Sequence, residues 1–160
     1  MNTLINPKQV NVLVFSLGLF AATSIAQGGE INTGYFGEVA IKGYDPVAYF
    51  TEEKAMQGSK DISHRWLGAV WNFSSEEHKS LFAESPVKYA PQYGGYCAGG
   101  LAYGDSTVNI DPEAWRIIDG KLYLNYDPGT AAELEEIDGH LEKTVENWPE
   151  IKAAMANYNQ

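Results

Sequence analysis

The stretch Trp71-Asn72-Phe73-Ser74-Ser75-Glu76-Glu77-His78 decides the fold, because one kind of secondary structure ends within it and another begins. Ahead of it, residues 62–67 and 69–73 flank Gly68 and are rich in aromatic and branched side chains. This composition on either side of a glycine is typical of a β-hairpin. The stretch is therefore predicted to lead out of a pair of antiparallel strands.

A helix is predicted to follow the hairpin at once. Ser74 can accept a hydrogen bond from the amide of Glu77 while the Glu77 side chain reaches back, so Ser74 is the expected N-cap. Apolar residues three and four positions beyond His78 give the helix one apolar face. The helix is expected to end before Pro86.

A second hairpin and a C-terminal helical segment are predicted downstream. Residues 115–119 and 121–126 surround Asp119-Gly120, a strong signal for a tight hairpin turn with positive φ. Residues 130–157 are rich in Ala, Glu, Leu and Lys, and are predicted to be helical with interruptions at Gly139 and Pro149.

Upstream of the first hairpin, residues 39–42 are a short strand candidate that stops at Gly43-Tyr44-Asp45-Pro46. Strands and helices are thus mixed without regular alternation, which predicts an α+β fold with a small antiparallel sheet, packed short helices and a C-terminal helical segment. No internal repeat, low-complexity tract or linker is apparent between residues 35 and 150.

The first 26 residues have the pattern of a signal peptide. Lys8 precedes an apolar run over residues 12–22, and Ser24-Ile25-Ala26 matches a cleavage site. The apolar run is shorter than the roughly 20 residues of a membrane span, so no stable membrane span is expected after cleavage. We expect a flexible lead-in over residues 27–34, a single domain over residues 35–160, and a periplasmic or secreted protein.

The net charge limits which kinds of partner the chain is expected to bind. The 160 residues carry 21 acidic and 11 basic side chains, a net charge of −10. Nucleic acid and anionic lipid surfaces are poor partners for such a chain, whereas metal ions and small molecules stay open and any protein partner is undetermined. Only one cysteine is present, so no disulfide can form within the chain.

That cysteine, Cys97, lies in the run Tyr93-Gly94-Gly95-Tyr96-Cys97-Ala98-Gly99-Gly100. A lone thiol in an oxidising compartment is buried and inert, bound to a metal ion, or reactive. The flanking glycine pairs permit unusual backbone dihedrals and the close approach of a partner.

Four segments together resemble the exported bacterial YHS-domain proteins. They are residues 41–50 (IKGYDPVAYF), 71–82 (WNFSSEEHKSLF), 86–98 (PVKYAPQYGGYCA) and 119–125 (DGKLYLN), and the likeness covers roughly residues 31–151. In part of that family selenocysteine occupies the position of Cys97, which implies redox or soft-metal chemistry there. Shorter YHS modules are associated with metal binding through a pattern like Phe-Cys-Ser-x-x-Cys, whose two cysteine positions are Ser74 and His78 in this chain.

The candidate metal ligands are Cys97, His64 and His78, because thiolate and imidazole suit copper and zinc. No two histidines have a ligand-type spacing, so the fold has to bring them together. Asp45 either accepts backbone N–H bonds in a turn or acts catalytically by taking a proton or orienting the thiol. The tyrosines with a possible ligand-binding role, otherwise explained by core packing, are Tyr44, Tyr93, Tyr96 and Tyr103.

Three functions follow from these residues. The first is binding of a soft metal ion, copper or zinc, with Cys97 as the central ligand. The second is a thiol-dependent redox enzyme in which Cys97 cycles through a sulfenic acid or mixed disulfide and needs an external resolving thiol. The third is a non-catalytic module that binds a small ligand or a protein, with Cys97 as packing.

Overall fold

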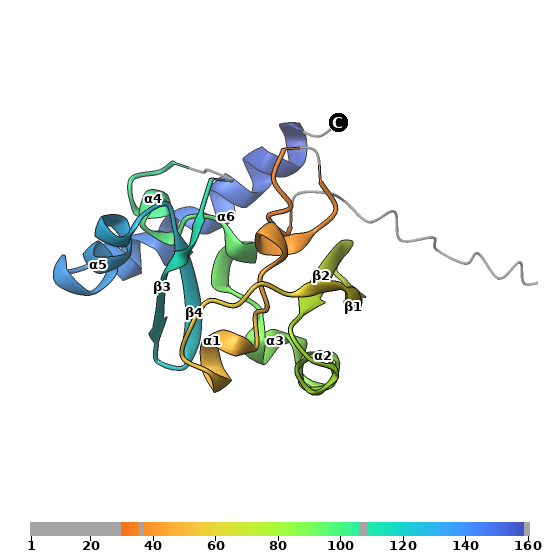
Figure 1. Cartoon of the computed structure of the whole chain (residues 1–160). Helices are drawn as coiled ribbons and strands as arrows, with labels where there is room; N and C mark the ends of the chain where they lie inside the picture. Colours follow the sequence, from red (N-terminus) through yellow and green to blue (C-terminus); the bar gives the residue numbers. More distant parts are fainter. Residues whose placement is uncertain (1–29, 36, 106–108, 159–160) are drawn as a thin grey trace, which may run out of the picture.

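A computed structural model describes residues 30–35, 37–105 and 109–158 and confirms the α+β fold (Figure 1). In place of one small sheet, the described residues form two separate two-stranded antiparallel sheets, β1–β2 and β3–β4. The elements in chain order are η1 Ala40–Gly43, α1 Ala48–Thr51, β1 Ser59–Trp66, β2 Ala69–Phe73, α2 Glu76–Glu84, α3 Pro86–Tyr89, η2 Gln92–Gly95, α4 Ala98–Ala102, β3 Asp111–Ile118, β4 Lys121–Asn125, α5 Pro128–Glu136 and α6 His140–Tyr158.

Both predicted hairpins are present, and each turns through two residues with positive φ, as predicted for Asp119-Gly120. Leu67 and Gly68 have φ values of 46° and 78°, and Asp119 and Gly120 have 51° and 71°. Two successive left-handed residues match the right-handed twist of the strands that they join. Each longer strand contains an irregularity far from the turn, between Ser59 and Ser63 in β1 and between Asp111 and Trp115 in β3.

The two hairpins belong to two units of the same design, displaced by 52 residues. The strand β1 begins at Ser59 and β3 at Asp111, and the pairing Ser59↔Phe73 corresponds to Asp111↔Asn125. The helices α2 and α5, which follow the hairpins, and the short η1 and η2 segments before them obey the same displacement. The structure therefore contains an internal repeat that the sequence analysis missed.

The segments η1 and η2 each contain left-handed backbone. In η1, Ile41, Lys42 and Gly43 have φ values of 43°, 56° and 79°, and the corresponding residues of η2 have values of 55°, 64° and 84°. The predicted strand over residues 39–42 is therefore wrong, although Val39 forms an isolated bridge to Val70. A positive φ is unfavourable for a β-branched residue, so the surrounding structure imposes this conformation on Ile41.

One buried asparagine connects the two left-handed segments. The Asn32 carbonyl accepts the amide of Ile41 at 3.0 Å, while its own amide donates to the Gly94 carbonyl at 2.8 Å. Its side chain donates to the Gly95 carbonyl at 3.0 Å. Ile31 and Asn32 are both buried, so these residues are part of the packed domain and not of a flexible lead-in.

The core is aromatic and lies between the two units. Phe82 of α2 packs against Trp71 and Phe73 of β2, with ring centroids 5.1 and 5.3 Å apart. The apolar side chains of β4, Leu122 and Leu124, are fully buried in the same cluster. Figure 1 shows α1, α2 and α3 at one end of the molecule and α4, α5 and α6 toward the other.

The C-terminal helical segment breaks once, not twice. Gly139, with a φ of 74°, lies between α5 and α6, as predicted. The predicted break at Pro149 is wrong, because α6 continues through this residue. Proline removes the hydrogen bond to the carbonyl four residues earlier, and that residue, Val145, is exposed, so water can replace the bond. The Trp148 ring meanwhile holds α6 against Tyr93, with centroids 5.5 Å apart.

The expected signal peptide over residues 1–26 lies outside the described residues. Within the part of the chain that the structure describes, no helix has both the length and the apolar character needed to cross a membrane.

Candidate functional site

Asp45 is a fully buried carboxylate at the start of α1. One of its oxygens, Oδ1, accepts the amide of Val47 at 2.9 Å and that of Ala48 at 3.4 Å. The predicted turn in which Asp45 accepts backbone N–H bonds is confirmed. The residues of η1 and Pro46 fix the backbone on either side, so the carboxylate has a set position.

Ser74 binds the other oxygen of Asp45. Its amide donates to Oδ2 at 2.8 Å and its hydroxyl at 2.7 Å. The predicted capping role of Ser74 is therefore wrong by one position, since Ser75 caps α2 by accepting the amide of His78 at 3.1 Å. Ser74 is not available for capping because its side chain points to the buried carboxylate.

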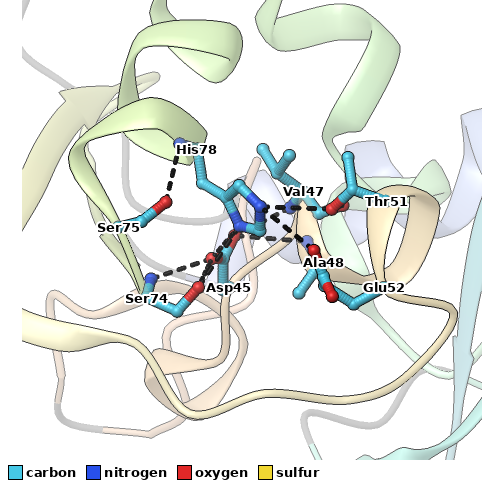
Figure 2. A network of polar contacts seen from close by, with 8 residues as sticks. All are labelled: Asp45, Val47, Ala48, Thr51, Glu52, Ser74, Ser75 and His78. Atoms are coloured by element: carbon cyan, nitrogen blue, oxygen red, sulfur yellow. Dashed lines mark hydrogen bonds and ion pairs between the residues drawn. The ribbon is translucent and has the colours of Figure 1, made fainter.

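His78 completes the network from α2 (Figure 2). Its Nδ1 lies 2.6 Å from Asp45 Oδ2, and both side chains are at least nine-tenths buried. A carboxylate only accepts hydrogen bonds, so we assign the proton of this contact to Nδ1. Ser74 Oγ lies 3.3 Å from the same nitrogen, which places both side chains around one carboxylate oxygen.

The second ring nitrogen of His78 faces the end of α1. Nε2 is 3.2 Å from Thr51 Oγ1 and 3.9 Å from Glu52 Oε1. Thr51 Oγ1 is also 3.2 Å from the Val47 carbonyl, which can only accept, so its one proton serves either the carbonyl or Nε2. When it serves the carbonyl, the Nε2 lone pair is open toward the half-exposed Glu52 carboxylate.

Thr51 and Glu52 were missed by the sequence analysis. Their only signal is that they follow Asp45 by six and seven residues, across a helix of four residues whose bounds the sequence does not define. His78 and Asp45 are 33 residues apart in the chain, and only the fold brings them together.

Cys97 occupies the position in the second unit that Asp45 has in the first. It precedes α4, is 1% exposed, and its Sγ accepts the amide of Tyr126 at 3.3 Å, as Asp45 accepts that of Ser74. Burial raises the pKa of the Cys97 thiol, and hydrogen bonds from the Gly100 and Tyr126 amides offset part of this effect. The thiol is therefore protonated near neutral pH and is a weak nucleophile in this state.

The second unit has no counterpart of the His78 imidazole. The equivalent residue is Thr130, whose amide is bonded to the Asp127 side chain at 2.8 Å. Among the described residues, none of the hydrogen bonds or ion pairs of Cys97 involves a histidine, and α4 lies apart from α2 in Figure 1. The structure thus does not join Cys97 and His78 in one set of ligands.

His64 is likewise separate from Cys97. It lies on β1 opposite Trp71, and its ring packs against Phe82 with centroids 6.3 Å apart. The His64 ring lies at the edge of the aromatic core, against a side chain of α2, the helix that also carries His78.

The four tyrosines have separate environments. Tyr44 is half-buried against the core and bridges to Gln57, whereas Tyr93 and Tyr96 pack on Trp148 of α6. Burial raises the pKa of both Tyr93 and Tyr96. Tyr103 is exposed and its hydroxyl donates to Glu133 at 3.2 Å. The aromatic packing of Tyr93 and Tyr96 agrees with the simpler of the two sequence interpretations.

Within the described ranges, no three His, Cys, Asp or Glu side chains are grouped so that they could hold a metal ion. Comparisons with protein-family models, with curated proteins and with solved structures gave no match. The arguments for function therefore come from the residues of this chain. The pair of His78 and Glu52 is the part of the site that offers a nitrogen and an oxygen ligand side by side.

Proposed function

We propose that the chain is an exported YHS-like domain that binds a zinc or copper ion through His78, with Glu52 as the second protein ligand. The observation that carries this proposal is the contact of His78 Nδ1 with the buried Asp45 carboxylate, at 2.6 Å. A histidine that ligates a metal almost always donates its other ring N–H to such a partner, which fixes the tautomer and makes the ligating nitrogen more basic.

The donor set supports a borderline metal ion. Imidazole and carboxylate suit zinc and Cu(II), and zinc sites with an open position combine protein ligands with water. His78 Nε2 and Glu52 Oε1, 3.9 Å apart, would supply one nitrogen and one oxygen. The ion would act by its charge and its open coordination positions, and the chain's own residues would orient the imidazole.

This proposal moves the metal from Cys97 to His78 but keeps the kind of ion. The environment of Cys97 does not fit a metal site, because the sulfur is buried and its hydrogen-bond partners are backbone amides. The family resemblance supports the same end of the molecule, since the two cysteine positions of the shorter modules correspond to Ser74 and His78. Both side chains here contact Asp45.

Titration of the purified protein with Zn(II) and Cu(II), in competition with a chromophoric chelator, tests the proposal. We expect His78→Gln to remove binding and Glu52→Gln to weaken it by about tenfold or more. His64→Gln is the matched control, because it removes an imidazole that lies outside the site, and it is expected to change nothing. Thermal melts of each variant separate loss of a ligand from loss of the fold.

Two results would overturn the assignment. Unchanged affinity in both His78→Gln and Glu52→Gln would leave the Asp45–His78 contact as a purely structural one. Loss of binding in Cys97→Ser with full binding in His78→Gln would return the metal to the cysteine.

A further inference from the structure

A second histidine of the described chain has an unused nitrogen, at the other end of the molecule. His140 is the first residue of α6 and is 3% exposed. Its Nε2 has no hydrogen-bond partner among the described residues. A buried polar atom without a partner is unfavourable, so it points to a group that occupies the site in solution.

The nearest charged group faces this nitrogen. Glu133 Oε2, from α5, lies 3.8 Å from His140 Nε2, which is too long for a hydrogen bond. Zinc bonds to imidazole nitrogen and to carboxylate oxygen are each about 2.1 Å long, so an ion held by both atoms at a bent angle spans such a gap. Two further acidic side chains, Glu136 and Asp138, are exposed at the end of α5 and just beyond it and add negative potential.

Tyr103 closes the same place from a third element. It follows α4, its hydroxyl donates to Glu133 Oε2 at 3.2 Å, and its ring packs edge-on against His140 with centroids 5.0 Å apart. The side chain is two-thirds exposed, so it can turn aside to admit an ion. Its phenol oxygen is a third potential ligand, beside the imidazole nitrogen and the carboxylate oxygen.

We propose that His140 and Glu133, with Tyr103 beside them, form a second cation site that takes a divalent transition-metal ion such as Zn(II). The site is independent of the one at His78, which lies on α2 at the opposite end of the molecule (Figure 1). Bound metal supplies the missing partner of Nε2 and links the ends of α4, α5 and α6. A proton on His140 Nε2, paired with the Glu133 carboxylate, would compete with the metal ion for this site.

The test uses the His78→Gln protein, in which the other proposed site is absent. Titration with Zn(II) is expected to show one remaining equivalent, and adding His140→Gln is expected to remove it. Adding Glu133→Gln, a change of nearly the same size at a partly exposed side chain, is expected to weaken binding by about tenfold or more. Adding Glu136→Gln instead is the matched control, since it removes an exposed carboxylate that forms no hydrogen bond or ion pair with His140 among the described residues.

The outcomes separate the two proposals. If His78→Gln removes one equivalent of bound zinc, that result concerns only the site at His78. If adding His140→Gln removes the remaining equivalent, the site at His140 is supported. Zinc binding that is the same in the His78→Gln protein with and without both Glu133→Gln and His140→Gln would overturn this site. Failure of the His78→Gln protein to bind any zinc would also overturn it, and would indicate that a proton or water occupies the gap.

Discussion

Asp45 and Cys97 hold the same place in two repeated units of one domain. Each follows a left-handed segment, precedes a short helix and accepts the amide of the residue 29 positions later. In the first unit the side chain is a carboxylate that binds Ser74 and His78, whereas in the second it is a thiol whose hydrogen-bond partners are backbone amides. Equivalent backbone positions have thus acquired different chemistry.

The buried carboxylate is expected to be critical for stability. Asp45→Asn places its N–H₂ group either where Ser74 and His78 donate or where the amides of Val47 and Ala48 donate, so donors face donors in both orientations. Breaking a buried pair of this kind costs about 3–5 kcal/mol in the free energy of unfolding. Urea unfolding measures the loss, and Glu52→Gln, which changes a half-exposed carboxylate of the same network, is expected to cost far less. Equal losses in the two variants would contradict this prediction.

The turn of the first hairpin is expected to tolerate a better residue. Leu67 has a φ of 46°, so its backbone is strained, and its side chain is exposed and contributes little packing. Leu67→Asn is expected to raise the free energy of unfolding by about 1 kcal/mol, because asparagine adopts the left-handed region readily.

Gly68→Ala is the control for this turn, because its φ of 78° disfavours any side chain. It is expected to lower the melting temperature while Leu67→Asn raises it. A lower melting temperature in Leu67→Asn would show that the leucine contributes contacts that outweigh its backbone strain.

Cys97 is expected to destabilise the fold at alkaline pH. Burial raises the pKa of its thiol. Its contribution to the free energy of unfolding is therefore fully present below the unfolded-state pKa of about 8.5 and is lost as the pH rises through the folded-state pKa. The difference in unfolding free energy between wild type and Cys97→Ser should therefore shrink or reverse above about pH 8.5. A difference independent of pH between 7 and 10 would contradict the raised pKa.

Asp127, the N-cap of α5, is expected to give the opposite dependence of stability on pH. Hydrogen bonds from the Thr130 amide lower the pKa of Asp127, so its contribution is present above the unfolded value of about 3.9 and is lost as the pH falls through the folded value. Asp127→Asn keeps a cap that does not titrate. The free energy of unfolding should therefore fall less steeply with decreasing pH in the variant than in the wild type. Parallel curves for the two proteins would contradict the role of Asp127 as a titrating cap.

The local elements were predictable from the sequence where single residues dictate them. Gly68 and Asp119-Gly120 located both hairpins, and Gly139 located the break before α6. The left-handed η1 was not predictable, because Ile41 favours a strand and only its packing in the folded domain overrides that preference. The repeat was hidden for the same reason: Asp45 and Cys97, or His78 and Thr130, share positions without sharing chemistry.

The candidate site was predictable as a set of residue types and not as a geometry. His78 and Asp45 were both singled out, but their pairing depends on α2 and α1 meeting across a separation of 33 residues. The choice between Ser74 and Ser75 as the cap depends on the same pairing, since local sequence allows either. Thr51 and Glu52 acquire a role only because Asp45 fixes the start of their helix.

The position of Asn32 between η1 and η2 bears on cooperativity. Three of its hydrogen bonds tie one left-handed segment to the other, so neither repeated unit can open without breaking contacts that also belong to its neighbour. We expect the two halves to unfold in one transition and not in succession. A shortened chain that starts at residue 35 lacks this tie, and hydrogen exchange should then distinguish two halves of unequal stability.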